Sequence, residues 1–148
     1  GGAFYDLGSG TGKPVVAAAI CHAFSKAVGI EILEGLHHAS VEVVRSWDVV
    51  GRPGTPQDRR TDIRFVHGDA TDPAAADWSD GDVVFANSTC FDDALMNRIA
   101  ERAAMLRRGA FVITLSRRLP GDGFAVLESR ALTMSWGAAT VFIHQKLV

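Results

Sequence analysis

The feature that most constrains this chain is a glycine-rich turn close to its first residue. Gly8, Gly10 and Gly12 alternate with other residues in the segment DLGSGTGK, which continues the apolar run AFYDL. Glycine at such positions permits a tight turn and a close approach of another group to the backbone. Pro14 follows, and proline is favoured in the first turn of a helix. The segment therefore predicts a buried strand, a tight turn and a helix, which is how an α/β fold begins.

Strand-like and helical segments alternate along the rest of the chain. Short apolar runs bounded by turn residues predict strands, and longer segments with helical periodicity predict helices. The predicted strands are Ala3–Leu7, Ile30–Leu33, Ile63–Asp69, Asp82–Ser88 and Gly109–Ser116. The predicted helices span about Lys13–Val28, 37–50, 72–78 (with Asp72 as its cap) and Asp92–Leu106. The segment 51–62, rich in proline, glycine and charge, predicts an exposed loop.

This alternation predicts the fold class. Strands connected by helices form a mostly parallel, Rossmann-like sheet with helices on both faces. The β-rich runs Phe124–Trp136 and Ala139–Val148 have no helix between them and predict a C-terminal antiparallel hairpin. The 148 residues fit a single domain, 1–148, with a sizeable core. The chain starts directly at its first predicted strand and without a methionine, so we interpret it as a fragment that lacks an N-terminal region.

Composition excludes several classes of protein. Fifteen basic and 17 acidic residues give no overall attraction to nucleic acids or to membranes, and we find no nucleic-acid-binding motif. Cys21 and Cys90 form no CxxC pair, and the five histidines show no zinc-type spacing with them, so we predict no metal site. No run of about 18 apolar residues is present, so we expect no membrane span.

The residues around the glycines distinguish between ligands. A phosphate-binding P-loop requires GxxxxGK[ST], but Leu7 stands at the first glycine position and Pro14 follows Lys13. Asp6, at the end of the strand, would repel a dinucleotide pyrophosphate and attract a cation. S-adenosylmethionine has no phosphate and carries an ammonium and a sulfonium, so Asp6 and the glycines favour this cofactor. The alternative is that Asp6 only shapes the turn.

Two further acids belong to the next two predicted strands. Glu31 lies about 20 residues beyond the turn, where an acid can accept hydrogen bonds from both hydroxyls of a ribose. Glu34 competes for this role, but we expect it to lie past the strand in solvent. Asp69, in the segment HGDA, is placed to accept a hydrogen bond from an adenine amino group. The alternative for Asp69 is a simple turn residue.

Several motifs together resemble one family. The segments FYDLGSGTGK, GIE, GDA, VVFANSTCF, RRGAFVITLS and MSW…FIH follow one another in its order. The chain resembles the Dot-one (disruptor of telomeric silencing) family of non-SET histone-lysine methyltransferases, over the cofactor-binding half of the family's catalytic domain. The resemblance implies a class I methyltransferase fold and S-adenosylmethionine as cofactor.

The resemblance also implies roles for individual residues. Asp6 and the glycines would hold the methionine part of the cofactor, Glu31 its ribose, and Asp69 with Ala70 its adenine. Asn87 would meet the methionine end near the transferred methyl group, and Phe91 and Trp136 would line the lysine channel. Ala70 stands where the family usually has an aromatic residue. Phe91 and Trp136 could instead be ordinary core residues.

The sequence therefore predicts a protein-lysine N-methyltransferase. The resemblance implies a nucleosomal histone as substrate, and hence the nucleus as its location. One alternative is a class I methyltransferase for a small molecule or a non-histone protein, which would fit the cytoplasm. Another is a cofactor-binding module without catalysis that serves as an interaction subunit.

Overall fold

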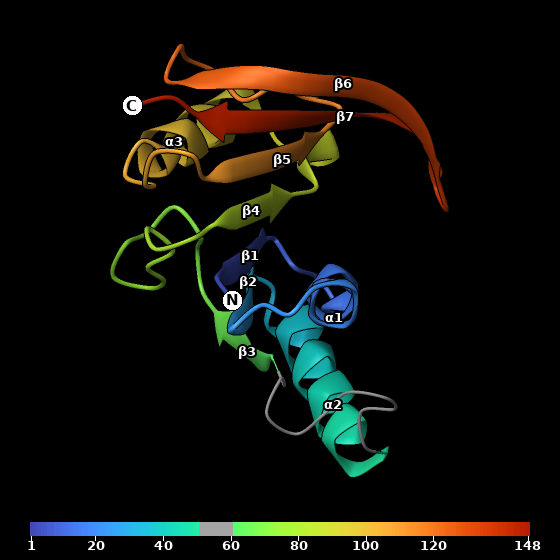
Figure 1. Cartoon of the computed structure of the whole chain (residues 1–148). Coiled ribbons are helices and arrows are strands. Elements are labelled where there is room, and N and C mark those ends of the chain that lie inside the picture. The colour runs from blue at the N-terminus through green and yellow to red at the C-terminus, as the bar shows by residue number, and fades with distance from the viewer. Residues whose placement is uncertain (51–60) are drawn as a thin grey trace. The chain divides into compact units, whose positions relative to one another are not determined.

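The structure, a computed structural model, describes residues 1–50 and 61–148 (Figure 1). The chain divides into two compact units, residues 1–77 and 78–148. The loop predicted for residues 51–62 lies outside the described residues as far as residue 60. Within the described ranges, no helix combines the length and the hydropathy that a membrane span needs. The prediction of one domain over the whole chain stays a prediction.

Three parallel strands form the sheet of the first unit. β1 (Ala3–Leu7), β2 (Lys26–Glu31) and β3 (Asp62–His67) lie in the order β3-β2-β1 and pair from the first residue of each strand. Every residue of β1 is buried, as expected for a strand of a parallel sheet. The helices α1 (Lys13–Cys21) and α2 (Glu34–Val50) pack against these strands.

All but β1 among the predicted elements of this unit differ in their bounds, since α2 starts three residues earlier than predicted and β3 ends two residues earlier, and two elements differ more widely. α1 ends at Cys21, well before its predicted end, and β2 spans Lys26–Glu31, whereas the sequence predicts Ile30–Leu33. After α1 the chain is bound into the sheet, because the Ser25 N–H donates to the Gly2 carbonyl at 2.8 Å. Pairing with β1 and β3 on both sides, with burial of the strand, outweighs the helical propensity of an alanine-rich segment.

Residues 73–75 form a turn, and residues 72–78 contain no part of the predicted helix. Asp72 does cap this turn, because its Oδ1 accepts from the Ala74 N–H at 2.9 Å and its carbonyl accepts from the Ala75 N–H at 3.1 Å. A helix of this length would form few hydrogen bonds, and these do not offset the loss of backbone freedom that helix nucleation requires. The chain instead leads to Trp78, which is fully buried.

The sheet of the second unit is mixed. Its strands lie in the order β4-β5-β7-β6, with the bounds Val83–Ala86 (β4), Phe111–Leu115 (β5), Gly137–Lys146 (β7) and Phe124–Met134 (β6). β4 and β5 are parallel, and β7 is antiparallel to both of its neighbours. β6 and β7 thus form the predicted hairpin, and its turn contains Ser135 and Trp136.

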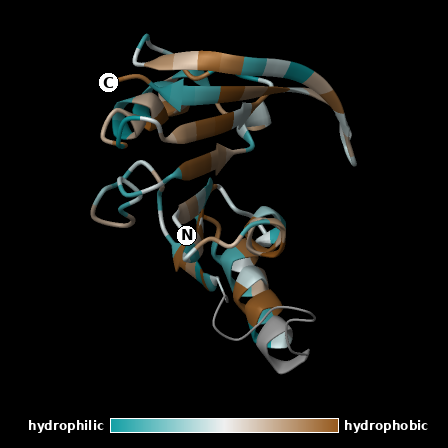
Figure 2. Ribbon diagram, in the orientation of Figure 1, coloured by the Kyte–Doolittle hydropathy of each residue, from teal (hydrophilic) through white to brown (hydrophobic). Residues whose placement is uncertain are grey.

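One helix and a short 3₁₀ turn complete the second unit. η2 (Ser88–Cys90) follows β4, and α3 (Asp93–Ala103) begins after Asp92, whose carboxylate accepts from the Leu95 N–H at 2.8 Å. α3 buries its apolar face, and hydrophobic residues also line β4 and β5 (Figure 2). Parallel strands followed by a terminal antiparallel hairpin confirm the predicted α/β class.

Candidate functional site

The glycine turn is tied to the end of β2. The N–H groups of Gly8 and Ser9 both donate to the Ile30 carbonyl, at 2.8 and 3.0 Å, and the Gly12 N–H donates to the Ser9 carbonyl at 2.8 Å. Gly8, Gly10 and Gly12 have φ angles of 77°, 53° and 86°. Residues with a side chain rarely adopt this left-handed region. The alternating glycines are therefore required by the backbone of the turn.

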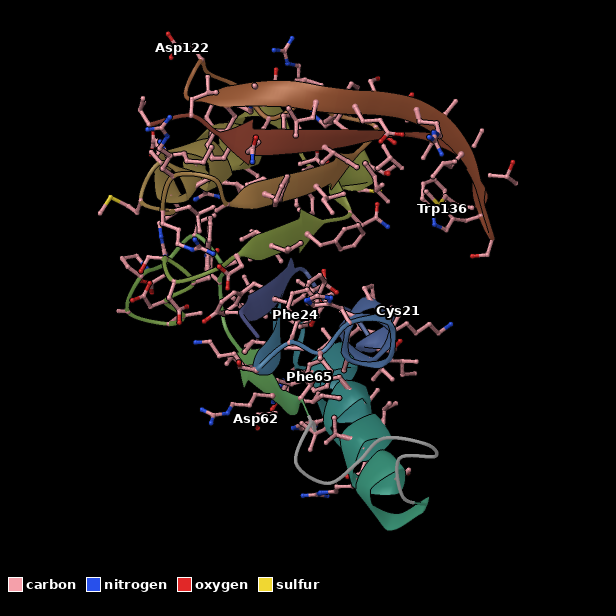
Figure 3. All side chains as sticks on the ribbon, viewed as in Figure 1. Cys21, Phe24, Asp62, Phe65, Asp122 and Trp136 are labelled. Carbon is pink, nitrogen blue, oxygen red and sulfur yellow. The ribbon has the colours of Figure 1, made fainter. Side chains whose placement is uncertain are left out.

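A ring packs directly beneath the turn. A Cβ atom added to Gly12 would lie 2.7 Å from Cε1 of Phe65, and one added to Gly29 would lie 2.6 Å from both Phe65 and Ser9 Oγ. Phe65 projects from β3 (Figure 3). Sequence reasoning missed Phe65 and Gly29. The signal that could have revealed them is the glycine inside β2, since glycine within a strand often marks a close approach.

Glu31 closes β2 and supports the turn. The residue is 6% exposed. Oε2 accepts from the Gly10 N–H at 2.7 Å, and Oε1 accepts from the Leu33 N–H at 2.8 Å. Glu34 lies in the first turn of α2 and is exposed. The expected places of the two acids are thus confirmed, Glu31 at the strand end and Glu34 in solvent, and each oxygen of Glu31 keeps a lone pair for a further donor.

Asp6 is the most unusual group of the first unit. It is 1% exposed, and neither carboxylate oxygen has a hydrogen-bond partner. Burial, and then the negative charge of Glu31, raise its pKa to about 7. The Ser9 hydroxyl is likewise buried without a partner. Since buried polar groups are normally paired, Asp6 and Ser9 fit a ligand that brings N–H donors and positive charge.

Asp69 follows β3 and shapes a turn. Its Oδ1 accepts from both the N–H and the hydroxyl of Thr71, at 2.8 Å each. Asp69 lies near Glu31, because the Gly68 N–H donates to the Glu31 carbonyl at 3.0 Å. Ala70 is half-buried beside it. An adenine-binding role for Asp69 and Ala70 stays a prediction.

Two exposed apolar side chains next to these acids were missed. Ile32 and Leu33 directly follow Glu31, and each is 59% exposed. They lie between the end of β2 and the start of α2, where the packing of the unit does not bury them. An apolar pair directly after a strand-ending acid was the available signal. Such side chains suit contact with a flat apolar ring.

In the second unit, Asn87 lies directly after β4. It is exposed, and its Oδ1 accepts from the Thr89 hydroxyl at 3.0 Å. Thr89 Oγ1 in turn lies 3.0 Å from the Ser116 hydroxyl, which follows β5. Ser116 has a φ angle of 63°. Sequence reasoning missed Thr89 and Ser116, because contact between residues so far apart in sequence depends on the pairing of β4 with β5.

The two aromatic candidates lie in different surroundings. Phe91 is half-buried at the end of η2. Trp136 is 51% exposed at the hairpin turn, so it is not the core residue that the alternative supposed (Figure 3). Leu115, the last residue of β5, pairs with Val141. β7 begins at Gly137, four residues before Val141, and a strand rises about 3.3 Å per residue. The hairpin turn therefore lies about 13 Å beyond the end of β5, at the same edge of the sheet as Asn87.

The described residues contain no group of three or more His, Cys, Asp or Glu side chains that could bind a metal. Cys21 and Cys90 are exposed free thiols.

Comparison with known proteins identifies the family. The sequence profile of the family described as histone methylation protein DOT1 matches residues 1–131. The chain belongs to the DOT1 family. No curated protein sequence matches it significantly.

Solved structures show that this DOT1-family chain has a methyltransferase fold. TrmN from Thermus thermophilus superposes with a TM-score of 0.78 at 20% identity, over 99% of this chain and 44% of TrmN. The tRNA methyltransferase TrmK from B. subtilis superposes with a TM-score of 0.68 at 15% identity, over 99% of this chain and 60% of TrmK. A methyltransferase from Pyrococcus furiosus superposes with a TM-score of 0.72 at 14% identity, over 100% of this chain and 76% of that protein. The chain thus spans less than half of TrmN.

The predicted Rossmann-like class I fold is thereby confirmed. Fold and family together imply S-adenosylmethionine as the cofactor. The unpartnered carboxylate of Asp6, beside a turn that admits no Cβ at Gly12, fits that assignment.

Proposed function

We propose that this chain is the cofactor-binding part of an S-adenosylmethionine-dependent protein-lysine N-methyltransferase that acts on a nucleosomal histone in the nucleus. The observation that carries the cofactor assignment is the buried carboxylate of Asp6, which has no partner. Membership of the histone methylation family supports the histone substrate.

The residues of the first unit would hold the cofactor. Asp6 would accept hydrogen bonds from its ammonium group, and the turn at Gly8, Gly10 and Gly12 would lie against its methionine part. Glu31 would accept from the ribose hydroxyls with its remaining lone pairs. Asp69 and Ala70 would border the adenine, with the exposed Ile32 offering apolar contact to the ring.

The residues of the second unit would serve the acceptor. S-adenosylmethionine, when bound, supplies an activated methyl group. A lysine amine has a pKa of about 10.4 in water and must lose its proton before it can act as a nucleophile. Phe91 and Trp136 would favour the neutral amine by excluding water from it, while Asn87 would orient the reacting groups. No strong base is required of the chain.

Two measurements test this proposal. Calorimetric titration should show binding of S-adenosylmethionine and not of NAD or ATP. Asp6→Asn should weaken that binding at least tenfold, since a hydrogen bond to a charged group contributes about 1.5–3 kcal/mol. Asp122→Asn, the same change at an exposed acid, should leave it unaltered. Tight NAD binding with no response to S-adenosylmethionine would refute the cofactor assignment.

The second measurement concerns the acceptor. Transfer of a labelled methyl group by the full-length protein should favour nucleosomes over free small amines and tRNA. Transfer to a small molecule or to a non-histone protein instead would favour the first alternative. Cofactor binding without transfer to any acceptor would favour the non-catalytic module.

A further inference from the structure

A chain of three polar side chains crosses the ends of β4 and β5. Asn87 Oδ1 accepts from Thr89 Oγ1 at 3.0 Å, and Thr89 Oγ1 lies 3.0 Å from Ser116 Oγ. A further contact fastens the same two segments together, since the buried Ser88 hydroxyl donates to the Leu115 carbonyl at 2.7 Å. η2 is therefore joined to the end of β5 through two side chains, Ser88 and Thr89.

The number of hydroxyl hydrogens determines which group donates in each of these hydrogen bonds. A threonine hydroxyl has one hydrogen, and Thr89 donates it to Asn87. Toward Ser116 the oxygen of Thr89 can then only accept, so Ser116 is the donor in that contact. With Oδ1 engaged by Thr89, the amide of Asn87 turns the two N–H bonds of Nδ2 away from Thr89.

Ser116, which makes this contact, has an unfavourable backbone conformation. Its φ angle of 63° is the only positive value among the described non-glycine residues. Its N–H donates to the Thr140 carbonyl at 2.7 Å, which ties it to β7. Such conformations persist where the surrounding structure imposes them, and they are concentrated at functional sites. The backbone of Ser116 is thus fixed by the fold at the position from which its hydroxyl reaches Thr89.

We propose that Thr89 and Ser116 are positioning residues that orient the Asn87 amide as a hydrogen-bond donor to an oxygen acceptor, a carboxylate or carbonyl group, of the bound ligand. In the proposed function, on which this inference rests, the matching group is the carboxylate of the cofactor's methionine part.

The test compares hydroxyl deletions with a conservative replacement. Thr89→Val keeps the shape of the side chain and removes the donor, Thr89→Ser keeps the donor, and Ser116→Gly removes the hydroxyl while relieving the positive φ. Thr133→Val, the same deletion at an exposed position of β6, is the matched control. The first readout is the side-chain amide signal of Asn87 in the ¹⁵N–¹H NMR spectrum of the free intact protein.

Thr89→Val should move that signal and speed its exchange with water, whereas Thr89→Ser and Thr133→Val should leave it in place. An unchanged signal in Thr89→Val would overturn the proposal whatever the protein binds. This readout needs no ligand, so it decides the geometry even if the wild type fails to bind S-adenosylmethionine, which would refute the proposed function separately.

The second readout is the affinity for S-adenosylmethionine. Thr89→Val should weaken binding about fivefold, as expected for one neutral hydrogen bond, and Thr89→Ser should restore it. Ser116→Gly should weaken binding while raising the melting temperature, a combination that a purely structural role would not produce. Wild-type affinity in Thr89→Val, despite a shifted amide signal, would show that the orientation of Asn87 does not serve the ligand and would overturn the positioning role.

Discussion

Replacing Asp6 by asparagine should change how the stability of the protein depends on pH. The pKa of Asp6 is raised from 3.8 to about 7, chiefly by burial and secondarily by Glu31. In the folded state Asp6 therefore keeps its proton up to about pH 7, while the unfolded chain releases it near pH 4. Stability from the protonated carboxyl is complete below pH 4 and is lost as the pH rises to 7.

The size of this loss of stability follows from the change in the pKa of Asp6. Three pKa units at about 1.4 kcal/mol each give a loss of about 4 kcal/mol between pH 4 and pH 7. An asparagine side chain at this position has no proton to lose. The free energy of unfolding of Asp6→Asn, minus that of the wild type, should therefore rise by roughly 3 kcal/mol from pH 5 to pH 8.

Urea unfolding at each pH measures this difference, with Asp122→Asn as the exposed control. The ¹³C signal of the Asp6 carboxyl should titrate near pH 7, and a bound cation should lower that midpoint. Affinity for S-adenosylmethionine should accordingly rise with pH, up to tenfold per unit, and level off above pH 7. A carboxyl midpoint near 4, with a flat difference in stability, would refute the argument from burial.

Three further substitutions test the site. Gly12→Ala should cost about 1–3 kcal/mol of stability by overpacking, because the new Cβ meets the ring of Phe65, and a melting curve checks this. Glu31→Gln should lower both stability and cofactor affinity, since the amide can no longer accept from both N–H donors, while Glu34→Gln changes neither in calorimetry. Trp136→Ala should leave the free energy of unfolding within about 0.5 kcal/mol of the wild type, as for other exposed positions, and lower methyl transfer to a lysine substrate.

The fold could be predicted where local patterns and long-range pairing agree. β1 is apolar throughout except for Asp6 and is followed by glycines, so its bounds and the start of α1 are predicted correctly. The segment after α1 continues an alanine-rich stretch and favours a helix locally, yet the chain uses it as β2. That choice depends on pairing with β1 and β3, which a local pattern does not contain.

Site residues could be predicted where their type and their neighbours in the sequence indicate their role. Asp6 precedes the glycine turn directly in the sequence, so its place near the end of β1 was predicted, whereas Glu31 was singled out from its spacing although the predicted strand bounds were wrong. Phe65 could not be found this way, because its role is to touch a glycine far away in the chain. Thr89 and Ser116 were missed for the same reason, because they come into contact only when β4 and β5 are paired.

The two acids of the first unit argue for a cationic ligand by themselves. Glu31 is buried but accepts two N–H groups, which compensates its charge. Asp6 lies close enough for Glu31 to raise its pKa, and it has no donor of its own. The protein therefore carries one compensated acid and one uncompensated acid side by side, an arrangement that costs stability at neutral pH. A phosphate ligand would worsen this repulsion, whereas an ammonium would relieve it. The electrostatics of Asp6 and Glu31 thus favour S-adenosylmethionine over a dinucleotide independently of any resemblance.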